Sequence, residues 1–156
     1  MNMKTAIFPG TFDPFTLGHA SVVRRGLRLF DKIIIAVGIN DAKQTLFTLG
    51  ERLGQIRACF PNDPRIVVCS YEGMTVDFAR KENAGFIIRG VRSLGDFEYE
   101  RLLSDVNQKI SEIDTVFLFT EPEFSSIQSN VVRELLKYHQ DISSFVPSAI
   151  IELLKK

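Results

Sequence analysis

The sequence is poor in cysteine and has no long apolar run. Its two cysteines, Cys59 and Cys69, lack metal-ligand spacing and a nearby histidine cluster. A disulfide framework needs more cysteines in a shorter chain, so both are interpreted as buried thiols of a reducing compartment. No apolar stretch approaches the length of a membrane span, and no signal peptide precedes the first strand-like segment. We therefore expect a cytoplasmic protein that does not associate with membranes.

An excess of charge of one sign is also missing. Nineteen basic side chains balance nineteen acidic ones, for a formal net charge of zero. This argues against broad binding to nucleic acid or to an anionic membrane, but it leaves room for a local basic pocket. Neither G-x-x-x-x-G-K-[ST] nor G-x-G-x-x-G occurs, so the P-loop and the dinucleotide fingerprint are excluded. The spacing of serine, cysteine, histidine and acidic residues does not indicate a serine–histidine–acid or cysteine–histidine catalytic site.

The sequence does contain a regular alternation of apolar, β-rich runs and amphipathic stretches. At 156 residues with 45% apolar side chains, the chain is long enough to bury a core. The runs KIIIAVG and TVFLF are apolar at consecutive positions, which is typical of strands covered on both faces. Five strands are predicted: Lys4–Phe8, Lys32–Gly38, Arg65–Ser70, Phe86–Arg89 and Thr115–Phe119.

Helices are predicted between and after these strands. Thr48 and Glu51 form a capping-box pattern in TLGE, and Ala84-Gly85 is a helix-stop signal. Alternation on this spacing favours right-handed βαβ units. The prediction is an α/β fold: a single Rossmann-like, doubly wound domain over residues 1–156, with a five-stranded parallel sheet and C-terminal helices. The expected helices are His19–Phe30, Thr48–Phe60, Thr75–Asn83, Ser93 towards Glu112, Ser129–His139 and one starting around Pro147.

The loop FPGTFDPFTLGH follows the first expected strand, and in such folds ligands bind at the carboxyl ends of strands. Gly10 can let the backbone approach a ligand closely, and Thr11 offers a hydroxyl. Gly18 and His19 fall at a helix start, where free amides and the helix dipole favour phosphate. His19 could donate to a phosphoryl oxygen on which charge grows. The alternative is a structural histidine packed beneath the loop.

Two further loops carry cationic side chains. Lys43 lies in a polar loop after the second strand, where a merely solvated lysine is the alternative. Arg89 ends the fourth strand, Gly90 allows a close turn, and Arg92 follows. Two guanidiniums at a strand end suit anionic oxygens, because each can make bidentate contacts. The alternative is that they form ion pairs with Asp96, Glu98 or Glu100.

After the fifth strand, EPEFSSIQSNVVR brings hydroxyls and amides to another helix start. This is again a phosphate-type site, with ordinary N-capping by Ser129 or Asn130 expected in addition. Four strand-end loops with phosphate-binding chemistry are hard to obtain by chance, so together they predict a phosphate-handling site.

These segments resemble a known superfamily. Thr11-FDPFTL-Gly18-His19 is similar to the T-x-G-H signature of the nucleotidylyltransferases, and IQSNVVR to their second signature, I-S-S-T-x-x-R. Within the superfamily, PGTFDPFTLGH and RGVRSLGDFEYE are most similar to the bacterial phosphopantetheine adenylyltransferases, over about Ala6 to Pro147. The resemblance implies transfer of AMP from ATP to 4′-phosphopantetheine, giving dephospho-coenzyme A and pyrophosphate in coenzyme A synthesis.

The resemblance also implies roles for individual residues. His19 would stabilise the transition state, with Lys43, Thr11 and Arg92 as the other catalytic groups. Phosphopantetheine would contact Thr11, Lys43, Thr75 and Arg89. ATP would contact Gly10, Thr11, Phe12, His19, Gly90, Val91, Arg92, Glu100, Phe124, Ser125, Ser126, Ile127, Gln128, Ser129 and Asn130.

Further implied features are Mg²⁺ bound with ATP, feedback inhibition by coenzyme A, and a homohexamer. A site with no protein nucleophile suits direct in-line displacement without a covalent enzyme intermediate, because this chemistry needs positioning and charge stabilisation. One departure from the family pattern is that Gln128 and Asn130 replace hydroxyl residues. Amides can still donate to phosphate, so activity is expected.

Three other functions compete with this one. A related enzyme could use a different acceptor, such as nicotinate mononucleotide, or transfer a cytidylyl group, against which RGVRSLGDFEYE argues. A nucleotide-sensing module could use the same pocket without catalysis, although His19 and Lys43 are both present. The third alternative is a purely structural Rossmann-like domain.

Overall fold

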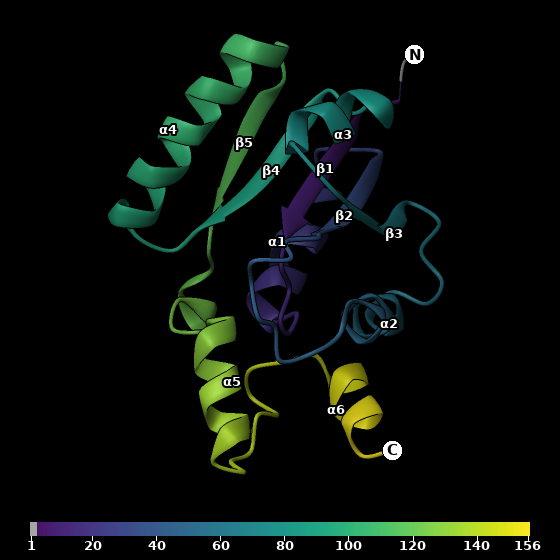
Figure 1. Ribbon diagram of the computed structural model, residues 1–156, viewed down its shortest axis with the longest axis vertical. Helices are drawn as coiled ribbons and strands as arrows, with labels where there is room; N and C mark the ends of the chain where they lie inside the picture. Colours follow the sequence, from purple (N-terminus) through teal and green to yellow (C-terminus); the bar gives the residue numbers. More distant parts are fainter. Residues whose placement is uncertain (1–2) are drawn as a thin grey trace.

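A single parallel sheet forms the centre of the protein, for which a computed structural model describes residues 3–156 (Figure 1). All five predicted strands are present, and their order is β3-β2-β1-β4-β5, so the predicted α/β fold with a five-stranded parallel sheet is confirmed. The order reverses between β1 and β4, which is where α/β folds bind ligands. The strands are β1 (Thr5–Gly10), β2 (Lys32–Gly38), β3 (Ile66–Tyr71), β4 (Phe86–Val91) and β5 (Asp114–Phe119).

Strands β1 and β4 both extend two residues beyond their predicted ends. The parallel ladder continues through the pairs Gly10–Val37 and Val91–Phe119, and this pairing keeps the residues extended. Gly90 therefore lies within β4, and its prediction as a turn glycine is wrong. A Cβ at Gly90 would lie 3.0 Å from the Val22 side chain, so glycine there permits close packing of a helix on the strand.

The predicted helices are also present, with corrected ends. The Thr48–Glu51 capping box is confirmed. Helix α3 ends at Lys81, and Asn83, with φ of 54°, takes the left-handed conformation after it, so the predicted stop signal at Ala84-Gly85 is wrong. The helices are α1 (Leu17–Gly26), α2 (Leu49–Cys59), α3 (Thr75–Lys81), α4 (Leu94–Ser111), α5 (Ser129–Lys137) and α6 (Ser148–Leu154), with Pro122–Phe124 forming a 3₁₀ turn.

The core lies on both faces of the sheet, as the consecutive apolar runs predicted. Ile33 to Val37 of β2 are fully buried. Because alternate side chains point to opposite faces, Ile35 packs in the cluster with α1, α2, α5 and α6, whereas Ile34 packs in the cluster with α3. The thiols Cys59 and Cys69 are free but half-buried, so their prediction as buried is only partly correct.

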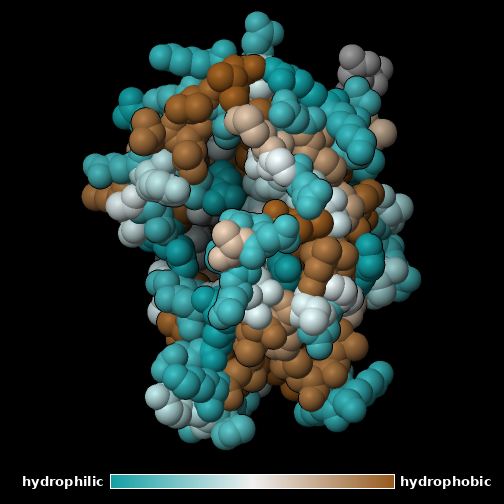
Figure 2. Space-filling view, viewed as in Figure 1, coloured by the Kyte–Doolittle hydropathy of each residue, from teal (hydrophilic) through white to brown (hydrophobic). Residues whose placement is uncertain are grey.

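Helix α4 differs from the others because none of its residues is buried. It packs along β4 and β5 and stands at the edge of the molecule (Figure 1). Several large apolar side chains remain exposed on it, and Figure 2 shows hydrophobic surface in this region. No helix of residues 3–156 is long and apolar enough to cross a membrane. The exposed apolar residues, called the α4 face below, are Leu94, Tyr99, Leu102, Leu103, Val106 and Ile110.

Candidate active site

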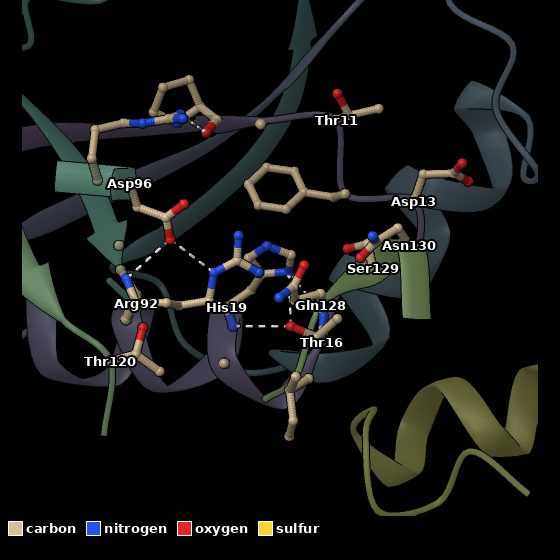
Figure 3. A pocket seen from close by; sticks show the side chains of 18 of the residues that line it. Thr11, Asp13, Thr16, His19, Arg92, Asp96, Thr120, Gln128, Ser129 and Asn130 are labelled. Carbon is tan, nitrogen blue, oxygen red and sulfur yellow. Dashed lines mark hydrogen bonds and ion pairs between the residues drawn. The ribbon is translucent and has the colours of Figure 1, made fainter. Parts of the chain in front are cut away.

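A cavity of about 360 Å³ opens at the carboxyl ends of β1 and β4, where the strand order reverses. Its walls come from the loop after β1, the loop after β2, the β4–α4 junction and the start of α5 (Figure 3). Four loops that are distant in sequence therefore meet as predicted. The predicted site residues on its walls are Gly10, Thr11, Phe12, His19, Lys43, Arg89, Gly90, Arg92, Glu100, Ile127, Gln128, Ser129 and Asn130.

A second hollow adjoins the first and shares part of its wall. Thr11, Lys43 and Arg89 line both. Thr75 lies in the second hollow, where its hydroxyl is 2.8 Å from the Tyr71 hydroxyl. Of the described residues that the sequence assigned to ATP, four are not on the walls of the first cavity: Val91, Phe124, Ser125 and Ser126.

The loop after β1 is shaped around an aromatic ring. Phe12 has φ of 51°, and its ring occupies the space that a side chain on Gly10 would need, since a Cβ there would lie 2.8 Å from the ring. Gly10 thus makes room for Phe12. It also lies on the cavity wall, where its predicted close approach to a ligand stays a prediction. The Phe12 ring is 4% exposed and meets the His19 ring edge-on at 5.0 Å between centroids. The loop therefore supports His19 from below with apolar surface.

His19 is held by the residue that begins its own helix. The Thr16 amide donates to His19 Nδ1 at 3.0 Å, and the His19 amide donates to Thr16 Oγ1 at 3.3 Å (Figure 3). Together these bonds form a capping box with histidine in place of the usual glutamate. Because Nδ1 accepts a hydrogen bond, the ring proton of the neutral imidazole resides on Nε2. The structural and functional interpretations of His19 are therefore compatible.

The surroundings of His19 keep it uncharged. Burial, and to a smaller extent the positive charges of Arg92 and Arg89, lower its pKa from the ordinary value of 6.5 to about 3. A neutral imidazole at physiological pH can donate one hydrogen bond from Nε2 but cannot act as a cation. Figure 3 shows the ring between the Arg92–Asp96 pair and the residues that begin α5.

The start of α1 offers less to a phosphate than predicted. Helix α1 begins at Leu17 because Thr16 is its N-cap. The Leu17 amide donates to the Phe145 carbonyl at 2.9 Å, and the His19 amide is used by Thr16. Two of the first-turn amides that the sequence suggested for anion binding are thus satisfied within the protein.

The start of α5 is different, and here the predicted capping residues are wrong. Gln128 is the N-cap and provides no side-chain cap. Ser129 Oγ instead donates to the Pro14 carbonyl at 2.8 Å, because α5 packs against the loop after β1. Within residues 3–156, no acceptor binds the amides of Ser129, Asn130 and Val131. This first turn is the uncapped helix start that faces the cavity.

Both predicted arginines are paired, as the alternative interpretation proposed. Arg89 makes a bidentate ion pair with Glu100 at 2.7 Å for each bond, and it also donates to the Pro9 carbonyl at 2.9 Å. Arg92 pairs with Asp96 at 3.1 Å. The pairs fix the two guanidiniums in the cavity wall, where each retains further N–H donors.

Lys43 reaches the loop after β1 although its own loop is exposed. Its Nζ donates to Thr11 Oγ1 at 3.2 Å. The ammonium and the hydroxyl thus meet where the two hollows join, which a merely solvated lysine would not do.

Sequence reasoning missed the residues that connect these loops. Asp13, 4% exposed, accepts hydrogen bonds from the amides of Leu46 and Phe47 at 2.8 and 2.9 Å. Arg52, 6% exposed, donates to the carbonyls of Thr11 and Phe47. A charged residue on an amphipathic helix is usually solvent-exposed, so nothing in the pattern of α2 marked Arg52.

A resident metal centre does not fit the donor set. No group of three or more histidine, cysteine or acidic side chains that could hold a metal occurs among residues 3–156. The cavity carboxylates are already engaged: Asp13 by backbone amides, Asp96 by Arg92 and Glu100 by Arg89. These three carboxylates are therefore already used in contacts within the protein.

Comparison with known proteins agrees with this geometry. Residues 7–144 match the family model described as cytidylyltransferase-like, which covers most of the chain. That description alone would also suit a cytidylyl transfer, so the individual relatives are informative.

Three curated relatives carry one name, phosphopantetheine adenylyltransferase. The protein of Bacteroides fragilis is 51% identical over 95% of this chain and 99% of its own length. That of Flavobacterium johnsoniae is 45% identical over 95% and 97%, and that of Lachnoclostridium phytofermentans is 44% identical over 97% and 94%. With the fold, the cavity and these identities in agreement, the chain belongs to the phosphopantetheine adenylyltransferase family of nucleotidyltransferases.

Proposed function

We propose that the protein transfers AMP from ATP to 4′-phosphopantetheine, giving dephospho-coenzyme A and pyrophosphate. The observation that carries the proposal is the junction of the two hollows, whose shared wall contains Thr11, Lys43 and Arg89. A hydroxyl, an ammonium and a guanidinium at this point suit the phosphate of an acceptor that must meet a nucleotide.

The acceptor occupies the second hollow. Lys43 and Thr11, already 3.2 Å apart, hold its phosphate together with Arg89. Thr75 contacts the pantetheine part further along the same hollow. The attacking phosphate oxygen then points into the first cavity, where the nucleotide lies.

The nucleotide occupies the first cavity. The unpaired amides at the start of α5 receive phosphate oxygens, and Arg92 donates from the opposite wall. Glu100 keeps Arg89 extended across the wall between donor and acceptor. Gln128 and Asn130 contribute amides where other family members have hydroxyls.

His19 acts in the transition state. Its Nε2–H donates to the α-phosphate as charge builds on the oxygens during displacement of pyrophosphate. Because the ring is neutral and its Nδ1 is held by Thr16, the donor is fixed in place without reorganisation. The acceptor phosphate attacks directly, in line with the leaving group, and no protein side chain forms a covalent intermediate.

Other parts of the proposal rest on the family resemblance. Magnesium would accompany ATP and would neutralise charge on its phosphates; no residue of this chain is assigned to it. Coenzyme A, which contains both an adenine nucleotide and a pantetheine arm, inhibits by occupying both hollows. Residues 1–156 form one nucleotidylyltransferase domain. The cytoplasmic location remains a prediction from the sequence.

A homohexamer is proposed as the assembly. The apolar side chains of the α4 face recur at helical spacing along an 18-residue helix, none of whose residues is fully buried within the chain. Covering them with another copy would remove apolar surface from water. Light scattering at micromolar concentration checks this, with Val106→Glu as the disrupting variant. A stable wild-type monomer would contradict the assembly.

The reaction is tested by pyrophosphate release from ATP, with and without 4′-phosphopantetheine. Release that depends on the acceptor is expected. Parallel reactions replace the acceptor with nicotinate mononucleotide, or ATP with CTP, so that the related enzymatic activities are distinguished. Tight ATP binding with no transfer to any acceptor would instead support a nucleotide-sensing module.

A further inference from the structure

The loop after β2, residues 39–48, carries Lys43 and lies at the surface. Most of its side chains are exposed, and Lys43 itself is exposed. The proposed role of Lys43 nevertheless requires its ammonium to stay near Thr11, at 3.2 Å from the hydroxyl. A flexible four-carbon side chain on an exposed loop does not supply this precision, so the loop must be fixed elsewhere.

Asp13 provides one such fixed point. Its two carboxylate oxygens accept separate hydrogen bonds from the amides of Leu46 and Phe47, at 2.8 and 2.9 Å. The side chain is buried, and Figure 3 shows its carboxylate turned away from His19. Arg133 of α5 donates to the Asp13 carbonyl at 2.8 Å and lies 3.9 Å from the carboxylate. Asp13 therefore contacts the lysine loop, whereas His19 is directed to the reaction.

Arg52 of α2 provides the second fixed point. One arm of its guanidinium donates to the Thr11 carbonyl at 2.8 Å, and its Nε donates to the Phe47 carbonyl at 3.2 Å. A single buried side chain thus joins the residue whose hydroxyl meets Lys43 to the end of the lysine loop. The planar fork of arginine can hold two carbonyls at a fixed separation.

We propose that Asp13 and Arg52 are positioning residues, which clamp the loop 39–48 to the loop after β1 and thereby set Lys43 against the acceptor phosphate. This inference rests on the proposed function of Lys43. It assigns no direct contact with either substrate to Asp13 or Arg52. Their effect on the reaction passes through the position of the lysine.

The test is a double-mutant cycle between Asp13→Asn and Lys43→Ala. Asparagine keeps the size of the side chain but turns an N–H₂ group towards one of the two amides. Asp13→Asn is expected to raise the KM for 4′-phosphopantetheine about tenfold or more and to change the KM for ATP less than about threefold. In the Lys43→Ala background, the same substitution should change the acceptor KM less than about threefold. Equal effects in both backgrounds would overturn the proposal, because they would show a general structural role.

A second measurement does not depend on activity. Hydrogen exchange of the amides of Leu46 and Phe47 should accelerate at least tenfold in Asp13→Asn and less in Arg52→Lys, which keeps the charge but loses the fork. Unchanged exchange in both variants would overturn the clamp. Asp31→Asn is the matched control, because Asp31 also accepts a backbone amide, from Lys4 at 2.8 Å, at the opposite end of the sheet.

Enzyme kinetics and hydrogen exchange together distinguish a failure of the proposed function from a failure of the proposed positioning role. If the wild-type protein shows no adenylyl transfer but Asp13→Asn accelerates exchange in the loop, the proposed function fails and the clamp stands without its catalytic purpose. If transfer occurs and the cycle is additive, the function stands and the positioning role fails. Should Asp13→Asn not fold, Arg52→Lys carries the same cycle, with a smaller rise in acceptor KM expected and additivity again contradicting the role.

Discussion

Helices α1 and α5 both begin at the same cavity, but their first turns are used in opposite ways. The first turn of α1 is capped by local residues: the Thr16 side chain accepts from the His19 amide, and the His19 ring accepts from the Thr16 amide. Helix α5 has no side-chain cap, and three of its first amides find no acceptor in residues 3–156. One helix start therefore fixes a side-chain donor, whereas the other keeps backbone donors free. Under the proposed function, α1 would serve transition-state stabilisation and α5 would serve ground-state phosphate binding.

The largest effect should come from removing the side chain that α1 fixes. His19→Ala is expected to lower kcat about 10²–10³-fold while barely changing ATP affinity, since a donor acting in the transition state contributes little to ground-state binding. Turnover, ATP binding and melting temperature should be measured on one preparation. A variant that keeps normal turnover would show that His19 serves the loop alone.

Giving α5 the cap that it lacks should have the next largest effect. Gln128→Asp places a carboxylate where it can accept from the first-turn amides and repel a triphosphate. The KM for ATP should rise about ten- to hundredfold, because hydrogen bonds to charged groups contribute about 1.5–3 kcal/mol, while the free energy of unfolding should rise by about 0.5–1 kcal/mol.

An uncharged control completes that experiment. Gln128→Ser with Asn130→Thr restores the hydroxyl pattern of the family and should leave turnover within about tenfold. Loss of ATP binding in this control as well would mean that the shape of the turn matters more than its free amides.

Opening the cap of α1 should have a smaller effect. Thr16→Ala removes the hydroxyl but leaves the backbone amide that holds His19 Nδ1. The expected cost is about 1 kcal/mol of stability, or about 2–4 °C in melting temperature for a chain of this size. Turnover should fall less than tenfold. A loss as large as that of His19→Ala would show that the Thr16 hydroxyl, and not the Thr16 amide, orients the His19 ring.

The smallest effect on turnover is expected from pH. Since the pKa of His19 is about 3 in the folded protein, protonation of this ring should cause no inflection in kcat between pH 8 and 6. Stability should behave differently. The unfolded chain binds a proton near pH 6.5 that the folded chain refuses, so this contribution is present above 6.5 and is lost as pH falls towards 3, by up to about 1.4 kcal/mol per unit. Denaturant unfolding of wild type and His19→Gln at pH 7 and 5 measures it.

Prediction from sequence succeeded where one physical signal dominated. The consecutive apolar residues Ile33 to Val37 favoured a strand covered on both faces, and the meeting of strand-end loops followed from parallel topology. Thr48 and Glu51 formed their capping box because both partners are local. Such features require no knowledge of distant contacts.

Prediction failed where contacts with residues distant in sequence determine the partner or the burial of a side chain. Ser129 was expected to cap α5, but Pro14, far away in sequence, takes its hydroxyl. The close approach of the Phe12 ring to Gly10 was not predicted either. The burial of Asp13 and Arg52 depends on how two loops and α2 meet. Local sequence patterns do not reveal these tertiary contacts.

The wall shared by the two hollows has a consequence for inhibitor design. A fragment that fills one hollow should compete with one substrate alone, whereas a molecule that passes Thr11, Lys43 and Arg89 into both should compete with donor and acceptor alike. Joining two such fragments makes the second contact intramolecular. With a linker matched to the span of this wall, the effective concentration can increase affinity by about 10²–10⁴ over that of either fragment.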